Sequence, residues 1–388
     1  MTGDADADGG NETTTTIDGG REPAAYSTQR YLAAKRTIDD RALDGRVLDR
    51  LARETPDSPA VLEVGAGIGT MVGRLLERDV LSGAVAYVAV DLDEASVAAA
   101  RERLPERARA TGYEVRRPGD GNRGDAAGSE FVFERADAAG GPERLALTLR
   151  VADAVAVADA VAAAGDDGVT LDDGTAFRAP AAGVDLLVGA AFLDLLAWPA
   201  VETLASAVRP GGYCYFPITF DGTTTFAPAD DPTFERRLER AFHAHLNAGT
   251  GTSRAGRRAL DRLPEAGVEV VAAAGSDWSV SPVGADAGGT ATGDVDPVPG
   301  TAHYPADEAY FVHHVVELVR GALSSRAETA DAGAGSDGDD RAGGAGDEGP
   351  NLDPERVEAW ARRRHGAVAR GELRYLTHQV DVLGRRRE

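Results

Sequence analysis

The sequence predicts an α/β protein with a doubly wound, mostly parallel sheet. The first observation behind this prediction is the apolar run from Val61 to Val64, which ends in a glycine-rich turn and continues as an amphipathic segment. That order indicates a strand, a tight turn and a helix. The second observation is the apolar run from Ala84 to Val90, which follows one helix later and ends in Asp91. Together the two runs predict a β-α-β unit, the repeating element of a parallel sheet.

The turn after the first strand predicts a nucleoside site. Gly65, Gly67 and Gly69 fall within five residues, and their missing Cβ atoms let a flat ligand lie against the backbone. A turn that binds a pyrophosphate has the spacing G-x-G-x-x-G, whereas this turn has G-x-G-x-G. Glu63, which precedes the turn, would repel a diphosphate and suits a cationic ligand or an amino group. These features favour S-adenosylmethionine over a nicotinamide dinucleotide.

The carboxylate at the end of the second strand is the next candidate. Asp91 can accept hydrogen bonds from both hydroxyls of a ribose, or it can cap the helix that starts at Glu94. In combination, Glu63 to Thr70 and Asp91 resemble the class I S-adenosylmethionine-dependent methyltransferases, and the resemblance covers about residues 60 to 220 in order. It implies a Rossmann-like, seven-stranded sheet with an antiparallel last strand. It also implies a cofactor site formed by Glu63, Gly65, Ala66, Gly67, Gly69, Asp91, Leu92 and Gly189.

The resemblance further implies an acid after the third strand that contacts the adenine amino group. Asp137 is similar, because it closes a β-branched and aromatic run that starts at Glu130. Asp153 and Asp159 are the alternatives, since a long alanine-rich stretch follows Asp137. The adenine acid is therefore expected at Asp137, with these two positions left open.

The composition is strongly acidic. Acids outnumber bases 64 to 41, the formal charge is −23, and Lys35 is the only lysine. This composition resembles that of proteins from halophilic archaea, whose carboxylate surfaces stay hydrated when concentrated salt screens their repulsion. The same field repels nucleic-acid phosphates, so we expect no nucleic-acid partner. No apolar run approaches the ~18 residues of a membrane span, which predicts a cytoplasmic protein without a membrane partner.

The other segments predict the rest of the sheet and two acidic insertions. We expect residues 1–22 to be disordered and 23–388 to form a single domain, with the cofactor core at about 56–222 and acceptor-side elements at 223–388. Disordered insertions are predicted at 284–300 and 325–349. The expected elements, in order, are one or two helices over 32–51, a helix to 78, a helix over 94–103, a third strand over 130–137, a helix over 146–164, a hairpin at 169–177, strands at 184–189 and 209–216, a helix from 232, a strand over 268–274, a helix over 307–323, a helix from 353 and a closing strand over 373–383.

Polar residues outside the cofactor motif are the candidates for contact with a methyl acceptor. Asp194 and Asp277 follow the fourth and sixth strands, where a carboxylate can take up a proton. For several of the other candidates a structural role is the alternative, as a helix-terminal charge, a core residue or the partner of a surface acid. The candidate acceptor-binding residues are Asp221, Ser253, Arg254, Trp278, Asp307 and Glu308.

The sequence therefore predicts an S-adenosylmethionine-dependent methyltransferase that acts on a small or medium metabolite. No cluster has metal-ligand spacing, so no metal is expected, and no oligomeric state is assigned. Two alternatives stay open. One is a regulatory protein that binds S-adenosylmethionine without catalysis, and the other is a nicotinamide-dependent oxidoreductase.

We expect the fold to need concentrated salt. The Debye length is about 10 Å at 0.1 M salt and about 3 Å at 1 M, so the excess carboxylates repel one another over longer distances in dilute buffer. The melting temperature, measured across a KCl series, should rise with KCl concentration. A melting temperature independent of KCl would contradict the halophilic interpretation of the composition.

Overall fold

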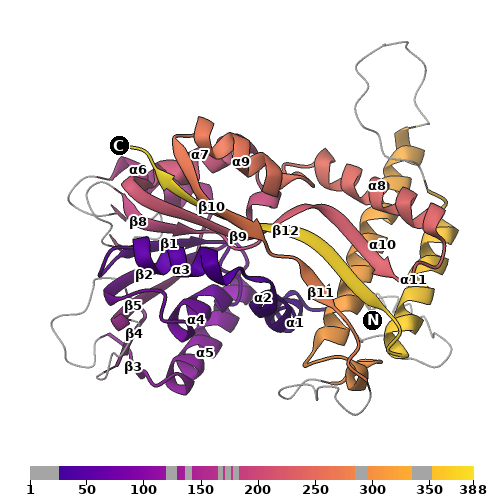
Figure 1. The fold of residues 1–388 in the computed structure, drawn as a ribbon, viewed down its shortest axis with the longest axis horizontal. Helices are drawn as coiled ribbons and strands as arrows, with labels where there is room; N and C mark the ends of the chain where they lie inside the picture. The colour runs from indigo at the N-terminus through magenta and orange to yellow at the C-terminus, as the bar shows by residue number, and fades with distance from the viewer. Residues whose placement is uncertain are drawn as a thin grey trace, which may run out of the picture.

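The computed structural model describes residues 26–118, 129–135, 142–164, 169–170, 176–177, 183–284, 296–333 and 352–388. Within these residues the chain forms two lobes (Figure 1). One lobe holds the parallel part of a sheet with helices on both faces, which is the doubly wound α/β fold that the sequence predicts. The other lobe is formed by strand ends and long helices.

The sheet is built around one buried strand that follows the N-terminal helices. Its parallel neighbours on the two sides continue the parallel region outward, and one antiparallel strand is inserted near the far edge. This arrangement confirms the predicted antiparallel closing strand. In spatial order the seven strands are β10 (Val268–Gly275), β12 (Arg374–Arg386), β9 (Val208–Ala227), β8 (Val184–Val188), β1 (Ala60–Val64), β2 (Gly83–Asp91) and β5 (Pro142–Val151).

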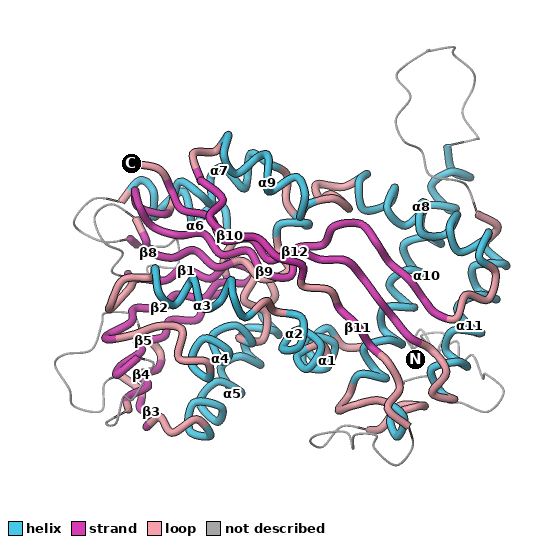
Figure 2. Tube along the Cα trace, in the orientation of Figure 1, coloured by secondary structure: helices cyan, strands magenta, loops and turns pink. Residues whose placement is uncertain are grey.

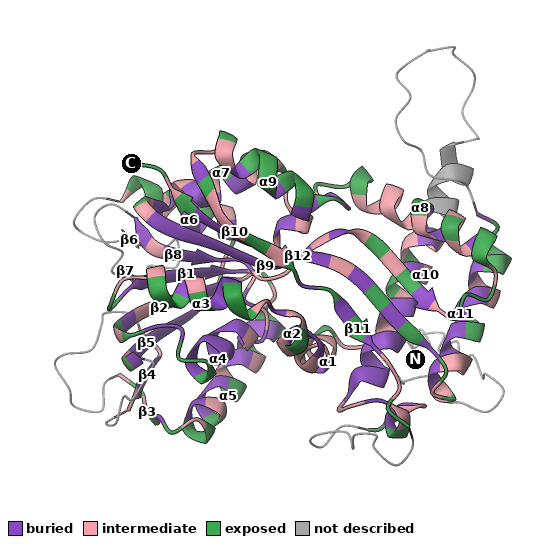
Figure 3. Cartoon of the chain, in the orientation of Figure 1, coloured by how far each residue is buried: buried purple, intermediate pink, exposed green. Residues whose placement is uncertain are grey.

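Side chains of β1 alternate between two hydrophobic cores, as the period of a strand requires. Val61 joins the core on one face, while Leu62 and Val64 join the core on the other. The first core is covered by α3 (Gly45–Glu54), α4 (Thr70–Glu77) and α5 (Glu94–Ala110). The second is covered by α6 (Ala154–Ala163), α7 (Trp198–Ser206) and α9 (Ala255–Glu265). Both faces of the parallel strands are therefore buried (Figure 3).

The third parallel strand is β5, and the prediction of a strand over 130–137 in that position is wrong. The 130–137 segment supplies β4 (Phe131–Glu134), which runs antiparallel to β5, and β3 (Glu114–Arg116) pairs antiparallel with β4. The predicted helix over 146–164 is also wrong in its first half. Leu145, Leu147 and Leu149 recur at alternate positions and join the same core, which is a strand period despite the alanine-rich composition that follows. Among the described residues this sheet has ten strands, three more than predicted.

The predicted small hairpin is confirmed. β6 (Val169–Thr170) and β7 (Ala176–Phe177) pair antiparallel as a separate two-stranded sheet. The turn residues that carried this prediction, 171–175, lie outside the described residues.

The second lobe grows from strands that run beyond the parallel sheet. The fifth strand was expected to end near 216, but β9 continues to Ala227 and stays paired with β12, which also pairs with β11 (Trp278–Val280) (Figure 2). Aromatic rings form the core here, with centroids of Phe226 and Tyr375 5.2 Å apart and those of Phe226 and Trp360 5.3 Å apart. The helices of this lobe are α8 (Pro232–Ala248), α10 (Glu308–Gly333) and α11 (Pro354–Ala369).

The N-terminal region forms three helices where one or two were predicted. α1 (Thr28–Ala34) contacts α10, and α2 (Arg36–Ala42) contacts β11, so both helices reach the second lobe. The side chains of Ser27 and Asp44 accept hydrogen bonds from the first-turn amides of α1 and α3. Short 3₁₀ turns occur at η1 (Leu193–Leu195) and η2 (Thr301–His303).

The predicted disordered segments lie mostly outside the described residues, including 1–22 and the bulk of both insertions. One boundary is wrong, because α10 continues to Gly333 where the second insertion was expected to begin at 325. The helix start at Glu308 and the starts of α8 and α11 after Asp231 and Asp353 agree with the prediction.

A buried chain of hydrogen bonds joins α10 to α11. A carbonyl oxygen can only accept, so Nε2 of His313 donates to the Pro299 carbonyl at 2.9 Å. Nδ1 of His313 then accepts from Nδ1 of His365 at 2.7 Å, and Nε2 of His365 lies 2.7 Å from Oε1 of Glu317. Burial, together with the neighbouring His365, lowers the pKa of His313 to about 4.

We expect the stability of this lobe to fall as the pH drops from about 6.5 to about 4. In that window the unfolded chain takes up a proton at His313 while the folded chain does not, which costs on the order of 2 to 3 kcal/mol. In denaturant unfolding, the free energy of unfolding of the His313→Gln protein should fall less than that of the wild-type protein over the same pH window. The control is His378→Gln, whose side chain is 41% exposed. Equal pH slopes for the wild-type and His313→Gln proteins would contradict the assignment.

Candidate functional site

A cavity of about 470 Å³ lies at the carboxyl ends of the parallel strands. Open α/β sheets bind their ligands at this edge. The walls come from the turn after β1, the residues after β2, β5 and β8, and the helices α1, α2 and α4. The lining residues include Thr28, Leu32, Lys35, Asp39, Glu63, Gly65, Ala66, Gly67, Arg74, Asp91, Leu92, Asp93, Ser96, Asp153, Ala190, Ala191, Phe192 and Leu196.

The glycine turn is fixed against the end of β2. The Ala66 amide donates to the Val90 carbonyl at 3.0 Å, and the Gly67 amide donates to Oδ2 of Asp91 at 2.7 Å. Gly65 has a φ of +63°, and a Cβ there would lie 2.4 Å from Cδ2 of Phe192. Gly67 has a φ of +54° and is approached by Leu32 of α1. Only residues without a Cβ allow both the left-handed backbone and these close approaches.

Two glycines predicted in the cofactor site do not line the cavity. Gly69 is the N-cap of α4, with a φ of +74°, and a Cβ on it would meet Leu104 of α5 at 2.6 Å. Gly189 lies against Phe216, where a Cβ would be 3.2 Å from the ring. Both residues permit close packing of the elements that carry the cavity.

Glu63 is buried, with 2% of its surface exposed, and its Oε2 accepts a hydrogen bond from the Tyr87 hydroxyl at 2.8 Å. Burial raises the pKa of Glu63 to about 8, against the opposing effects of Tyr87 and Arg74. The carboxyl is therefore mostly uncharged at neutral pH. An uncharged Glu63 does not attract a cationic ligand in the way that the sequence predicts, although the side chain does line the cavity.

Two carboxylates stand at the ends of adjacent strands. Asp91 ends β2, and its oxygens accept from the amides of Gly67 and Asp93. Each carboxylate oxygen has a second lone pair, so these bonds orient Asp91 and leave it able to accept from a ligand. Asp153 follows β5 and caps α6 by accepting from the Ala156 amide at 2.8 Å. Leu92, which follows Asp91 and also lines the cavity, is 69% exposed.

The acid expected after the third strand falls at Asp153, one of the two alternatives. Asp137 lies outside the described residues, and β4, which precedes it, runs antiparallel to the third parallel strand. The chain therefore leaves β4 at the edge of the sheet opposite to the cavity. Asp159, the other alternative, lies exposed on α6.

The loop after β8 forms a wall beside the glycine turn, where Phe192 packs against Gly65. Ala191 has a φ of +50°, and its amide donates to the carbonyl of Pro217, next to Ile218 with a φ of +58°. Such backbone angles are strained for residues with a Cβ. Asp194 follows in η1. Its Oδ1 is buried without a hydrogen-bond partner, and burial raises the pKa of its carboxyl.

Helices α1 and α2 close the cavity, and Asp39 joins them to both lobes. Oδ2 of Asp39 accepts from Nη2 of Arg74 at 3.1 Å, and Oδ1 accepts from Nε1 of Trp278 at 2.9 Å. Asp39 and Arg74 are 1% and 3% exposed. Trp278 therefore reaches the site through Asp39, since it does not itself line the cavity.

Asp307 and Glu308 hold these helices in place. Asp307 forms a bidentate ion pair with Arg30 of α1, with Nε to Oδ2 at 2.8 Å. Glu308 is fully buried and accepts from Arg41 and Thr37 of α2. Both carboxylates are engaged by the covering helices, and neither is among the residues that line the cavity.

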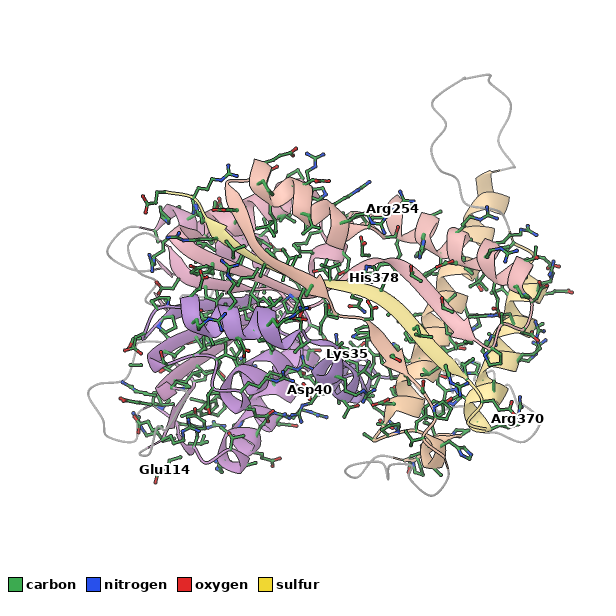
Figure 4. The ribbon with its side chains drawn as sticks, viewed as in Figure 1. Lys35, Asp40, Glu114, Arg254, Arg370 and His378 are labelled. Carbon is green, nitrogen blue, oxygen red and sulfur yellow. The ribbon has the colours of Figure 1, made fainter. Side chains whose placement is uncertain are left out.

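Other predicted acceptor residues lie away from the cavity. Asp221 is paired with Arg257, and Asp277, whose side chain is 60% exposed, lies 2.7 Å from Nδ1 of His378. Ser253 is buried, its amide bonded to Asn247. Arg254 has an exposed side chain at the start of α9 (Figure 4). The structure therefore does not bring these residues together with the glycine turn.

Three residues of the site were not singled out from the sequence, and they differ in the sequence signal that they carry. Asp153 follows the alternating pattern of β5 and precedes a helix, which marks both a strand end and a cap. Lys35 was visible only as the single lysine. The role of Asp39 had no local signal, because Trp278 lies 239 positions away in the chain.

The described residues contain neither a metal-binding cluster nor a membrane-spanning helix. No group of three or more His, Cys, Asp or Glu side chains in the described ranges could hold a metal ion. No helix among the residues described is long and apolar enough to cross a membrane.

No protein-family model and no curated protein matches the sequence. Among solved structures, the chain is similar to a putative methyltransferase from Bacillus halodurans, with 11% identity and a TM-score of 0.39 over 89% of this chain and 100% of that one. It is also similar to an S-adenosylmethionine-dependent methyltransferase from Geobacter sulfurreducens in complex with S-adenosylhomocysteine, with 13% identity and a TM-score of 0.36 over 92% and 98%. A third similar structure is the Haloferax volcanii complex of the Trm112 methyltransferase activator with a putative methyltransferase. The identity is 13% and the TM-score 0.34, over 90% of this chain and 98% of that one. These similarities are distant, so the site itself has to carry a functional proposal.

We expect Asp39→Asn to destabilise the protein strongly. It removes the more buried of the two carboxylates that pair with the buried Arg74, and breaking one side of a buried pair typically costs about 3 to 5 kcal/mol. The matched control is Asp40→Asn, since Asp40 also bonds Arg74, at 2.6 Å, but is 29% exposed. Denaturant unfolding in concentrated KCl measures both. Equal losses in the two variants would contradict the central role of Asp39.

Proposed function

We propose that the protein is an S-adenosylmethionine-dependent methyltransferase that acts on a small or medium metabolite. The observation that carries the proposal is the edge of the cavity where the glycine turn, Asp91 and Asp153 meet. A turn without Cβ atoms, followed by carboxylates at the ends of two adjacent strands, suits a nucleoside with hydroxyl and amino groups to donate. The exposed Leu92, next to Asp91 in the chain, offers an apolar surface for a base.

The residues present fit the methyl donor. Asp91 would hold the ribose hydroxyls, Asp153 would hold the adenine amino group, and the turn at Gly65 and Gly67 would lie along the rest of the donor. When bound, S-adenosylmethionine supplies a methyl group on a positively charged sulfur. The buried Arg74 is already neutralised by Asp39 and Asp40, so it adds no unpaired positive charge to the wall.

The order of the strands supports this cofactor over a nicotinamide dinucleotide. In the dinucleotide-binding fold the sixth strand continues the parallel sheet. Here β12 runs antiparallel between β9 and β10, the arrangement that the resemblance to class I methyltransferases implies. The topology thus replaces the weakened charge argument based on Glu63.

The chain's own contribution would be mainly positioning. Holding a nucleophile about 3 Å from the methyl carbon, in line with the sulfur, supplies much of the rate of such a transfer. The acceptor's nucleophile would give up a proton as it receives the methyl group, and S-adenosylhomocysteine would be released. Asp194, with its unpartnered Oδ1 and raised pKa, is the candidate to take up that proton.

The covered cavity supports a small acceptor. Its volume of about 470 Å³ lies within the range of small-ligand sites, and α1 and α2 cover it. A donor and a modest metabolite would share this space. A polymer would have to enter beneath two helices that ion pairs hold to α10.

We expect Asp91→Ala to weaken S-adenosylmethionine binding by about 1.5 to 3 kcal/mol, the range for hydrogen bonds to a charged group. Asp153→Ala should also weaken it. Asp159→Ala is the matched control, because this acid lies exposed on α6 and does not line the cavity. Titration calorimetry in concentrated KCl measures all three. Unchanged affinity in a folded Asp91→Ala protein would contradict the proposed site.

A turnover assay separates an enzyme from a binding protein that uses the same cavity. Incubation with labelled S-adenosylmethionine and a pool of small metabolites should yield S-adenosylhomocysteine and a labelled metabolite. Binding without turnover across the pool would favour a regulatory protein.

A further inference from the structure

Lys35 is the only lysine in the chain, and it lines the cavity. It lies between α1 and α2, ending the first helix and starting the second. Figure 4 shows it near the middle of the molecule between the two lobes, whereas Glu114 and Arg370 lie at the outer ends. Its side chain is 13% exposed. A chain that uses arginine for every other basic side chain therefore has its single lysine in the candidate site.

The Lys35 ammonium has no closely bonded carboxylate partner. The nearest carboxylate oxygen is Oδ2 of Asp39 at 3.8 Å, which is beyond hydrogen-bond range. Asp39 is already engaged by Arg74 and Trp278. The ammonium also lies 5.4 Å from the centre of the Trp278 ring. A poorly hydrated cation beside a cavity, with its nearest carboxylate already engaged, is a binding group for an anion.

Lys35 and Asp194 interact electrostatically, although Asp194 does not itself line the cavity. Burial raises the pKa of Asp194, and the Lys35 ammonium opposes that rise. Burial and the nearby Asp39 and Asp194 carboxyls raise the pKa of the Tyr31 hydroxyl, which links these groups to one cluster. The charges that act on Glu63, at the glycine turn, are instead those of Arg74 and Asp91.

We propose that Lys35 binds a carboxylate of the methyl acceptor, so that the substrate is a small acid. This inference rests on the proposed function. Lysine can fill the role because its ammonium is a compact point charge that pairs with a carboxylate without the fixed planar geometry of a guanidinium–carboxylate pair. The carboxylate of the donor's own amino-acid part is the competing occupant, and the experiment below separates the two.

The single lysine makes a selective probe available. Reductive methylation with ¹³C-formaldehyde keeps the positive charge and labels only Lys35 and the N-terminal amine, and the Lys35→Arg protein identifies which NMR signal is which. At constant KCl, benzoate and acetate should shift the Lys35 signal, whereas the neutral benzamide and acetamide should not. Absence of a shift with both acids, or equal shifts with the amides, would overturn the proposal.

A second titration distinguishes the acceptor from the donor. S-adenosylmethionine carries a carboxylate, and methylthioadenosine lacks the amino-acid part. Equal, small shifts of the Lys35 signal with both compounds support the acceptor assignment. A shift with S-adenosylmethionine alone would mean that Lys35 binds the donor, and the proposal would be wrong. Failure of the calorimetric test at Asp91 would overturn the proposed function while leaving the benzoate result readable.

Substitution provides an independent readout. Lys35→Gln should raise the dissociation constant of benzoate at least tenfold, measured by saturation-transfer NMR on the benzoate ring protons. Arg46→Gln removes the same charge from a side chain that is 87% exposed, and it should change the constant less than twofold. Equal changes of the dissociation constant in the two variants would show that benzoate is held by general electrostatic attraction and not by a site at Lys35, and the proposal would be wrong.

Discussion

The buried carboxylate of Asp39 connects the parts on which the rest of the site depends. It accepts from Arg74 in the helix after the glycine turn and from Trp278 in the second lobe, while itself belonging to a covering helix. With both partners in place its two oxygens are hydrogen-bonded, so a charged group can stay inside the protein. One residue thus fixes the position of the covering helices relative to the turn and to the second lobe.

The second lobe has a positional role that follows from its strands. Because β9 and β12 run on together beyond the parallel sheet, they provide a base for α10 and its aromatic core. α10 in turn holds α1 and α2 through Asp307 and Glu308. The extended strands therefore support α10, which holds α1 and α2 over the cavity. The acids that the sequence suggested as ligands, Asp307 and Glu308, make these contacts.

The parts of the fold that were predicted correctly have local signals. The glycine turn and β2 are encoded by adjacent apolar and special-backbone residues, and α8 and α11 each begin with an aspartate cap followed by proline. The third strand was missed because leucine alternation in β5 competes with an alanine-rich stretch of helical composition. The acceptor side was mostly missed because contacts such as Arg30 to Asp307 join residues 277 positions apart. No pattern within a window of sequence reports such a contact.

The acidic composition limits which electrostatic interactions can act in the site. In molar salt an exposed charge is screened within about 3 Å, so surface attraction does little to guide or hold a charged ligand. Groups removed from the solvent keep their interactions, because ions do not enter to screen them. The charges around the cavity fit this limit: Asp39 and Arg74 are buried, and Lys35 is only 13% exposed. A protein with this surface can recognise a charged ligand only where its own packing excludes the salt, and the covering helices create such a place.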